Sequence, residues 1–245
     1  MIYEYPFNER VRVLLRLENL YTRYTFFLRQ ETIHDHHVAL DTLFDILEVV
    51  TRTDLKADLL KEIERYMRSI KNNGQSASEE DRTPNLRQQL DQACLALVAT
   101  HGKPGHKLKH NEWLMGVRNR TIIPGGGCTF DIPSYWTWLQ KPASQRLADL
   151  NGWFESIQPV MDATLLLLKI LRADAVAEEV QIKSGHYRQM LQSRKAQLLR
   201  VEIQGDIVPE VSANRFMLWI RFTQQDGILK PKPIQEDITC KLTLC

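Results

Sequence analysis

The chain lacks several features that would assign it to a well-marked class of protein. It has only four cysteines (Cys94, Cys128, Cys240 and Cys245) and no CxxC pair, which argues against a disulfide scaffold or zinc ribbon and suits a reducing cytoplasm. Its purely apolar runs, such as Ala93 to Ala99 and Leu165 to Leu168, are far too short to span a bilayer. The amino terminus has no basic region followed by an apolar core, so we expect no secretory signal and no membrane partner.

A strong excess of charge of one sign is also missing. The 32 Lys and Arg residues nearly balance the 30 Asp and Glu residues, for a net charge of +2. Dedicated nucleic-acid-binding proteins are usually more basic than this, so composition predicts no nucleic-acid partner. A hydrophobic content of 43% over 245 residues is typical of a soluble globular protein with one or two domains.

Catalytic motifs are absent as well: the sequence has no GxSxG, HExxH, GxGxxG or Walker lysine. The glycines 125–127 lack the Lys-Ser/Thr that would contact phosphate, and a turn is the better interpretation. A polar cluster near residue 35 could be imagined as metal ligands, but such residues are common at the start of a helix; it comprises His34, Asp35, His36, His37 and Asp41. We therefore expect no catalytic residue, metal or cofactor.

Apolar residues at helical spacing dominate the first two thirds of the chain, whereas period-two alternation follows residue 176. Helices are predicted to begin near Asn8, Asp35, Asp54, Pro84, Ser144 and Pro159. Residues 72–83 have nothing to bury and predict a mobile loop. Strands are predicted near 180–182, 186–191, 199–204, 215–222 and 238–244. The fold class is therefore α+β, with a helical domain at 1–176 and a small antiparallel β domain at 177–245.

Residues 118–139 interrupt the helical pattern, because Pro124 lacks a donor and the glycines that follow it favour turns. We expect a turn or short strand here, in which Ile122, Cys128 and Phe130 could add short strands, so that 118–134 could pack on the β domain. Cys128 is expected to be a half-buried structural thiol. Trp136 and Trp138 are expected to anchor the core, although one of them could have a partner-binding role.

Two basic regions remain. Arg215 and Arg221 are six residues apart on a predicted strand, so they should share a face with Met217 and Trp219, opposite Phe216, Leu218, Ile220 and Phe222. That face either binds a peptide with carboxylates and hydrophobic side chains or is an ordinary solvated face with Trp219 packed internally. Residues 101–120 form either a solvated loop or an electrostatic surface for an acidic partner; their basic residues are Lys103, Lys107, Lys109, Arg118 and Arg120, with His101, His106 and His110.

Several motifs resemble those of the ZapD family of bacterial Z-ring-associated proteins, in the right order over nearly the whole chain. They are Tyr5-Pro-Phe-Asn-Glu9 with Arg12, Leu15-Arg-Leu-Glu18, Asp58-Leu-Leu-Lys-Glu-Ile-Glu-Arg65, Ile123-Pro-Gly-Gly126, Cys128-Thr-Phe-Asp-Ile-Pro133, Trp138-Leu139, Arg215-Phe216 and Ile220-Arg-Phe222. The Pro-Gly-Gly block is the most specific of them.

The resemblance implies a helical domain followed by a β-sandwich-like domain in a cytoplasmic homodimer with no enzymatic activity. It also implies binding to the C-terminal tail of the tubulin-like protein FtsZ and bundling of FtsZ filaments at the midcell septum. Basic residues carry that interaction in the family. Arg16, Arg52 and Arg221 match them, and Arg215 matches with a shift of two residues, which keeps the same face of a strand. Glu112 and Trp136 depart from the family pattern, where some relatives have a basic residue and a histidine.

Two classes of function stay open on the sequence alone. The favoured one is a non-enzymatic adaptor that holds a peptide tail and cross-links filaments, with Arg16, Arg52, Arg215, Trp219 and Arg221 as tail-binding residues. The other is a nucleic-acid-binding or regulatory dimer that uses the region 101–120.

Overall fold

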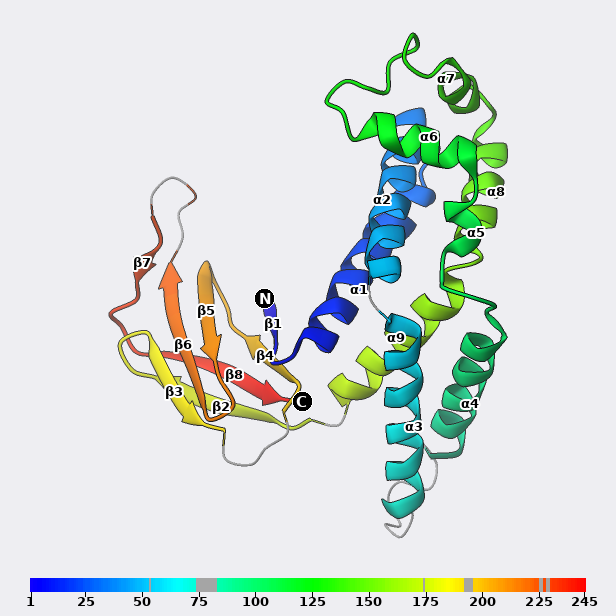
Figure 1. The fold of residues 1–245 in the computed structure, drawn as a ribbon. Coiled ribbons are helices and arrows are strands. Elements are labelled where there is room, and N and C mark those ends of the chain that lie inside the picture. Colours follow the sequence, from blue (N-terminus) through cyan, green and yellow to red (C-terminus); the bar gives the residue numbers. More distant parts are fainter. Residues whose placement is uncertain (53, 74–82, 174, 192–195, 225–226, 228–229) are drawn as a thin grey trace. The chain divides into compact units, whose positions relative to one another are not determined.

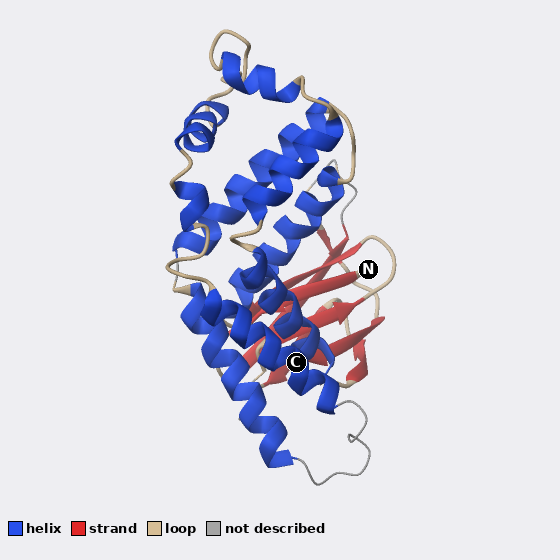
Figure 2. Cartoon of the chain, turned by 90° about the vertical axis from the view of Figure 1, so that its right-hand side faces the viewer, coloured by secondary structure: helices blue, strands red, loops and turns tan. Residues whose placement is uncertain are grey.

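The structure is a computed structural model that describes residues 1–52, 54–73, 83–173, 175–191, 196–224, 227 and 230–245. Its internal contacts divide the chain into two compact units (Figures 1 and 2). The helical unit is Leu14–Leu168, and the β unit combines Met1–Val13 with Lys169–Cys245. The α+β fold class predicted from the sequence is confirmed.

The helices follow the amphipathic segments of the sequence. They are α1 (Glu9–Leu28), α2 (Ile33–Arg52), α3 (Leu55–Asn73), α4 (Thr83–Ala99), α5 (His106–Lys109), α6 (Glu112–Thr121), α7 (Pro133–Leu139), α8 (Ala143–Phe154) and α9 (Gln158–Ala173). Most of the predicted loop at 72–83 lies outside the described residues. Side-chain caps start several helices: Asn8 Oδ1 accepts a hydrogen bond from Val11 N at 2.9 Å, and Thr32 Oγ1 accepts one from Asp35 N at 3.1 Å.

Helix α2 forms the centre of the helical unit. Its residues Leu40, Leu43, Ile46, Leu47 and Val50 are fully buried, and its neighbours are α6, α7 and α8. Helices α3 and α4 lie side by side in both views (Figures 1 and 2). An apolar stripe at positions three and four residues apart is what places α2 inside, since only that face can be removed from water without burying charge.

A buried arginine of α8 forms hydrogen bonds with residues near the start of α2 and the end of α7. Arg146 of α8 donates from Nε to His36 Nδ1 at 2.9 Å and from Nη1 to the carbonyl oxygen of Leu139 at 3.0 Å. It also donates to the carbonyl oxygens of Lys141 and Glu31. Because each guanidinium nitrogen has an acceptor, the buried charge is solvated by the protein itself. His36 is therefore a structural partner of Arg146.

The segment 118–139 differs from the prediction. Residues 118–121 complete α6, residues 122–132 form turns, and Pro133 occupies the first turn of α7. Neither Ile122, Cys128 nor Phe130 is in a strand, so that expectation was wrong. Gly126 is needed because a Cβ there would lie 2.1 Å from the carbonyl oxygen of Arg120, and Gly125 has φ of +76°. The glycines thus permit a tight return of the chain after α6.

Two antiparallel sheets make up the β unit. The strands are β1 (Ile2–Pro6), β2 (Ala177–Ile182), β3 (His186–Met190), β4 (Leu198–Glu202), β5 (Ile207–Ala213), β6 (Met217–Gln224), β7 (Lys232–Pro233) and β8 (Ile238–Leu244). The first sheet has the order β1-β4-β8-β2; the second has the order β3-β6-β5, and β7 also pairs with β6. We call the second one sheet B. One apolar core contains side chains of both sheets, which is the arrangement of a sandwich.

Strand β1 lies within the range that the sequence assigns to the helical domain. It pairs with β4 from Ile2 opposite Glu202 to Pro6 opposite Leu198. In addition, Arg172 at the end of α9 forms an ion pair with Glu4, with 2.6 Å between Nη2 and Oε2. The amino-terminal residues are therefore part of the β unit, which a reading along the chain cannot foresee because their partners are almost two hundred residues away.

The core face of β6 is shorter than predicted. Leu218, Ile220 and Phe222 are buried, but Phe216 precedes the strand and is 61% exposed. Asn214 explains the difference, because its Oδ1 accepts hydrogen bonds from the backbone nitrogens of Phe216 and Met217 and closes a turn there. The expectation that Phe216 is a core residue was wrong.

The corrected core predicts an asymmetric response to two truncations. Ile220→Ala should lower the free energy of unfolding of the β unit by about 2–5 kcal/mol, because it leaves a cavity between the sheets. Phe216→Ala should change it by less than about 0.5 kcal/mol, because the side chain is at the surface. Urea unfolding followed by far-ultraviolet circular dichroism would compare them, and equal losses would contradict the assignment of Phe216 to the surface.

Stability of the helical unit should depend on pH through His36. Burial and the nearby Arg146 charge lower the pKa of His36, so the unfolded chain takes up a proton before the folded one does. The stabilisation linked to this lowered pKa is fully present above the unfolded-state pKa of about 6.5 and is lost as the pH falls below that value. Urea unfolding between pH 7 and 5 should show this loss in the wild type.

A pair of histidine variants isolates the effect. His36→Gln keeps an acceptor for Arg146 but cannot titrate, so its stability should vary less between pH 7 and 5. His34→Gln, at an exposed position on the same helix, should retain the wild-type pH dependence. If both variants retain it, the titrating group is not His36.

Candidate functional site

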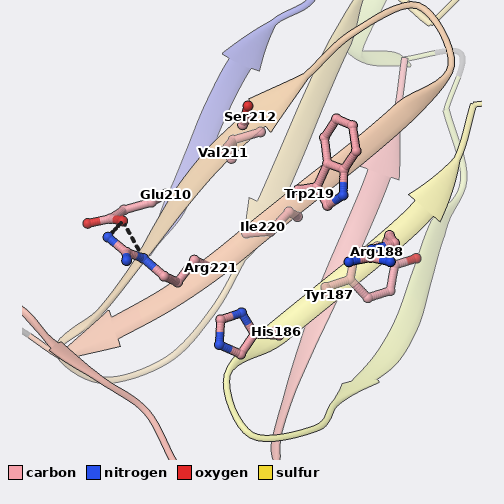
Figure 3. Close-up of a pocket in the computed structure, with 9 residues that line it drawn as sticks. All are labelled: His186, Tyr187, Arg188, Glu210, Val211, Ser212, Trp219, Ile220 and Arg221. Carbon is pink, nitrogen blue, oxygen red and sulfur yellow. Dashed lines mark hydrogen bonds and ion pairs between the residues drawn. The ribbon is translucent and has the colours of Figure 1, made fainter.

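The outward face of sheet B holds a shallow pocket of about 510 Å³. Figure 3 shows side chains from three neighbouring strands around it: His186 and Arg188 on β3, Trp219 and Arg221 on β6, and Glu210 on β5. Alternation positions them, because Leu218, Ile220 and Phe222 of β6 face the core and send the side chains between them outward. The predicted outward direction of Trp219 and Arg221 is what the structure has.

Arg221 already has a partner within the sheet. Its Nε and Nη2 both donate to Glu210 Oε2, at 2.8 Å and 2.5 Å (Figure 3), and Glu210 is the residue directly opposite in the β5–β6 register. Both side chains remain about half exposed, at 55% and 40%. Such exposed pairs are worth roughly 0.2–1 kcal/mol, so a competing carboxylate can replace Glu210 at little cost.

Trp219 lies in the next row across the strands. It is opposite Arg188 on β3 and Ser212 on β5, and its indole is half-buried. The row beyond it pairs Met217 with Met190, and Met190 is 65% exposed. The face thus changes from charged to apolar along the strands, which suits a peptide that has both acidic and apolar side chains.

Arg215 is not on the strand. It lies in the bend between β5 and β6, exposed, and its guanidinium carbon is 4.4 Å from the centre of the Phe216 ring. The argument from strand alternation that gave Arg215 and Arg221 a common face was therefore wrong. A role for Arg215 in binding stays a prediction that rests on the family resemblance.

The other two predicted tail-binding arginines belong to α1 and α2. Arg16 is exposed on α1, within the helical unit, and it makes an interaction with another residue. Arg52 is the last residue of α2, and its side chain lies outside the described residues. Their roles in binding stay predictions that rest on the family resemblance.

The basic region 101–120 is folded. It contains α5 and α6 rather than a solvated loop, with Leu108, Leu114 and Val117 buried. Arg118 is paired internally, with 2.7 Å between its Nη2 and Glu48 Oε2 on α2. Lys107, Lys109 and Arg120 are exposed. The surface available to an acidic partner is therefore smaller than the sequence predicts.

The polar cluster near residue 35 is built into the helical unit. His37 Nδ1 is 2.5 Å from the Tyr135 hydroxyl, and its Nε2 is 3.3 Å from Asp41 Oδ2. Burial raises the pKa of Asp41, and the neighbouring His37 opposes that shift. Within the described part of the chain, no three His, Cys, Asp or Glu side chains group as metal ligands.

Two further expectations about the 118–139 segment were wrong. Cys128 is exposed, and its Sγ donates to the carbonyl oxygen of Gly125 at 3.0 Å. Trp136 is 41% exposed, whereas Trp138 is buried as expected and donates from Nε1 to Asp149 Oδ2 at 2.9 Å. Ile122, Phe130 and Trp136 are all exposed, so this segment is surface rather than core.

Comparison with known proteins decides the family. The family model described as "ZapD: Cell division protein" matches residues 15–221. Curated proteins named cell division protein ZapD, from Janthinobacterium sp. (strain Marseille) and Ralstonia pickettii (strain 12J), are each 46% identical over 248 and 251 residues. Each match covers 100% of this chain and 99% of the relative. The chain belongs to the ZapD family. A third relative, from Ralstonia nicotianae (strain ATCC BAA-1114 / GMI1000), matches to the same extent.

Membership of the ZapD family makes this chain a cell division protein that is not an enzyme, as the absence of catalytic motifs predicted. No described helix has the length and apolarity needed to cross a membrane. Of the two positions that depart from the family pattern, Glu112 is in the first turn of α6, where a negative charge is favourable, and Trp136 is on α7.

Sequence reasoning missed three residues of the pocket: His186, Arg188 and Glu210. The alternation of β5 is weak, because apolar Val208 occupies an outward position and Pro209 an inward one, and β3 carries Gln189 on its inner side. Only the pairing of β3 and β5 with β6 brings their side chains beside Arg221 and Trp219. The signal available in the sequence was the spacing of His186 and Arg188, which are two positions apart on a predicted strand and therefore share a face.

Proposed function

We propose that this chain binds the C-terminal tail of FtsZ and, as a homodimer, cross-links FtsZ filaments at the midcell division septum. The observation that carries the proposal is its full-length membership of the ZapD family. The pocket on sheet B is the tail-binding site, with Arg221 and Trp219 among the binding residues. Arg16, Arg52 and Arg215 contribute further positive charge by their match to the family.

The chemistry of the pocket supports a peptide ligand. Guanidinium groups bind carboxylates through paired, directional hydrogen bonds, and Trp219 offers an apolar surface of low conformational entropy beside them. In the region 101–120, Arg118 is ion-paired with Glu48, so less of its positive charge is available to a nucleic acid than the sequence predicts.

Bundling requires two binding sites on one particle. A two-fold dimer presents two equivalent copies of any surface site. Once one tail is bound, the second site meets the tails of a neighbouring filament at high effective concentration, so filaments associate more strongly than one tail binds.

Removal of the FtsZ tail should abolish the interaction. Low-speed pelleting with full-length FtsZ should recover bundles and this chain together, whereas FtsZ filaments without the C-terminal tail should leave the chain in solution. Affinity for the tail peptide should fall as salt rises, since the Debye length shrinks from about 10 Å at 0.1 M to roughly 3 Å at 1 M. Bundling of tail-less filaments would refute the proposal, and a salt-independent affinity would point to apolar docking on Trp219 and Met217.

Cross-linking through a dimer makes its own prediction about size. Analytical ultracentrifugation of the purified chain should give about twice the mass of 28.5 kDa at the concentrations at which bundles form. Electron microscopy of the same preparation gives the second readout. A chain that sediments as a monomer and still bundles filaments would require two distinct sites on one chain.

A further inference from the structure

The pocket on sheet B contains a second arginine whose electrostatic state differs from that of Arg221. The strand register arranges the outward side chains in two rows, His186–Arg221–Glu210 and Arg188–Trp219–Ser212. Successive outward residues on one strand are two positions apart, or roughly 6.6 Å. Both guanidinium groups are therefore within reach of one short peptide.

Arg221 forms an ion pair, whereas Arg188 forms none with the residues that the structure describes. Arg221 donates two hydrogen bonds to Glu210, so the charges of the two side chains neutralise each other. Arg188 is exposed, lines the pocket, and makes no ion pair or side-chain hydrogen bond with any residue that the structure describes. Of the two arginines and the one carboxylate around the pocket, the net positive charge is thus contributed by Arg188.

The neighbours of Arg188 suit a peptide rather than a small anion. It lies directly opposite Trp219 across the β3–β6 pair, and the exposed Met190 follows two residues later on the same strand. Because β3 is at the edge of sheet B, an extended chain can approach Arg188 without crossing another strand. A carboxylate next to an apolar side chain would meet Arg188 and Trp219 together.

We propose that Arg188 makes the first ion pair with the acidic tail and that Glu210 is an internal competitor which a second tail carboxylate displaces from Arg221. This inference rests on the proposed function, since it names residues for the same site. Exchange of one carboxylate for another leaves Arg221 paired in both the free and the bound state. Arg221 therefore contributes little to the free energy of tail binding. Arg188 has no ion-pair partner among the described residues in the free state and gains one in the complex, so it contributes more to the free energy of tail binding than Arg221 does.

The test is titration of a fluorescently labelled FtsZ tail peptide with full-length variants at 0.1 M salt. Arg188→Gln should weaken binding about tenfold, because it removes a charge-assisted hydrogen bond made only in the complex. Arg221→Gln should weaken it less. Glu210→Gln should tighten it by roughly two- to fivefold, the range that corresponds to loss of an exposed ion pair. Lys241→Gln, on an exposed position of β8 in the other sheet, is the matched control and should bind as the wild type does.

A double variant separates competition from simple repulsion. If Glu210 acts by holding Arg221, Glu210→Gln should no longer tighten binding when Arg221→Gln is also present. If it still tightens binding, Glu210 repels the tail directly and the competitor role is wrong. Arg188→Lys, which keeps the charge, should bind more tightly than Arg188→Gln, and thermal melts should show that each variant is folded.

The outcomes distinguish this inference from the function on which it rests. A wild-type chain that does not bind the tail peptide would overturn both. A wild-type chain that binds the tail, with Arg188→Gln equal to the Lys241→Gln control, would overturn the assignment of Arg188 and leave the proposed function in place.

Discussion

Burial of one face of β6 is the constraint on which the β unit and its surface depend. Leu218, Ile220 and Phe222 are each at most 1% exposed, and a shift of register by one residue would place all of them in water and bring Trp219 and Arg221 into the core. Burying an arginine without a partner costs several kcal/mol. The same packing that stabilises the sandwich therefore determines which side chains of β6 can meet a ligand.

The neighbours of β6 then determine the chemistry of that surface. Strand β5 supplies Glu210 opposite Arg221, and β3 supplies Arg188 opposite Trp219. Without Glu210 the face would present two unpaired arginines, which would attract any anion from a distance. Pairing one of them internally lowers this non-specific attraction. It leaves a single guanidinium, unpaired among the described residues, across from an apolar ring, and under the proposed function this favours a peptide with both features.

The sequence could predict what depends on local periodicity. The helix start at Asn8 and the alternation of Leu218, Ile220 and Phe222 follow from capping and period-two patterns. It could not predict β1, whose partner β4 is almost two hundred residues away, nor the turn by which Asn214 moves Phe216 to the surface. For the same reason, Arg221 and Trp219 were found on their own strand, whereas Arg188 and Glu210 required knowledge of which strands pair. Patterns along one strand give its two faces but not its neighbours.

The proposed site is suited to weak, repeated contacts rather than to one tight complex. Its pocket is shallow, its ion pair is half exposed, and exposed pairs exchange partners at a cost near the thermal energy. A dimer of the proposed kind would gain its strength from valence, because each added tail on a filament raises the chance that both binding sites are occupied. Filament association would then respond steeply to tail density while single tails dissociate readily. A tighter site would gain affinity for one tail but would release that tail more slowly.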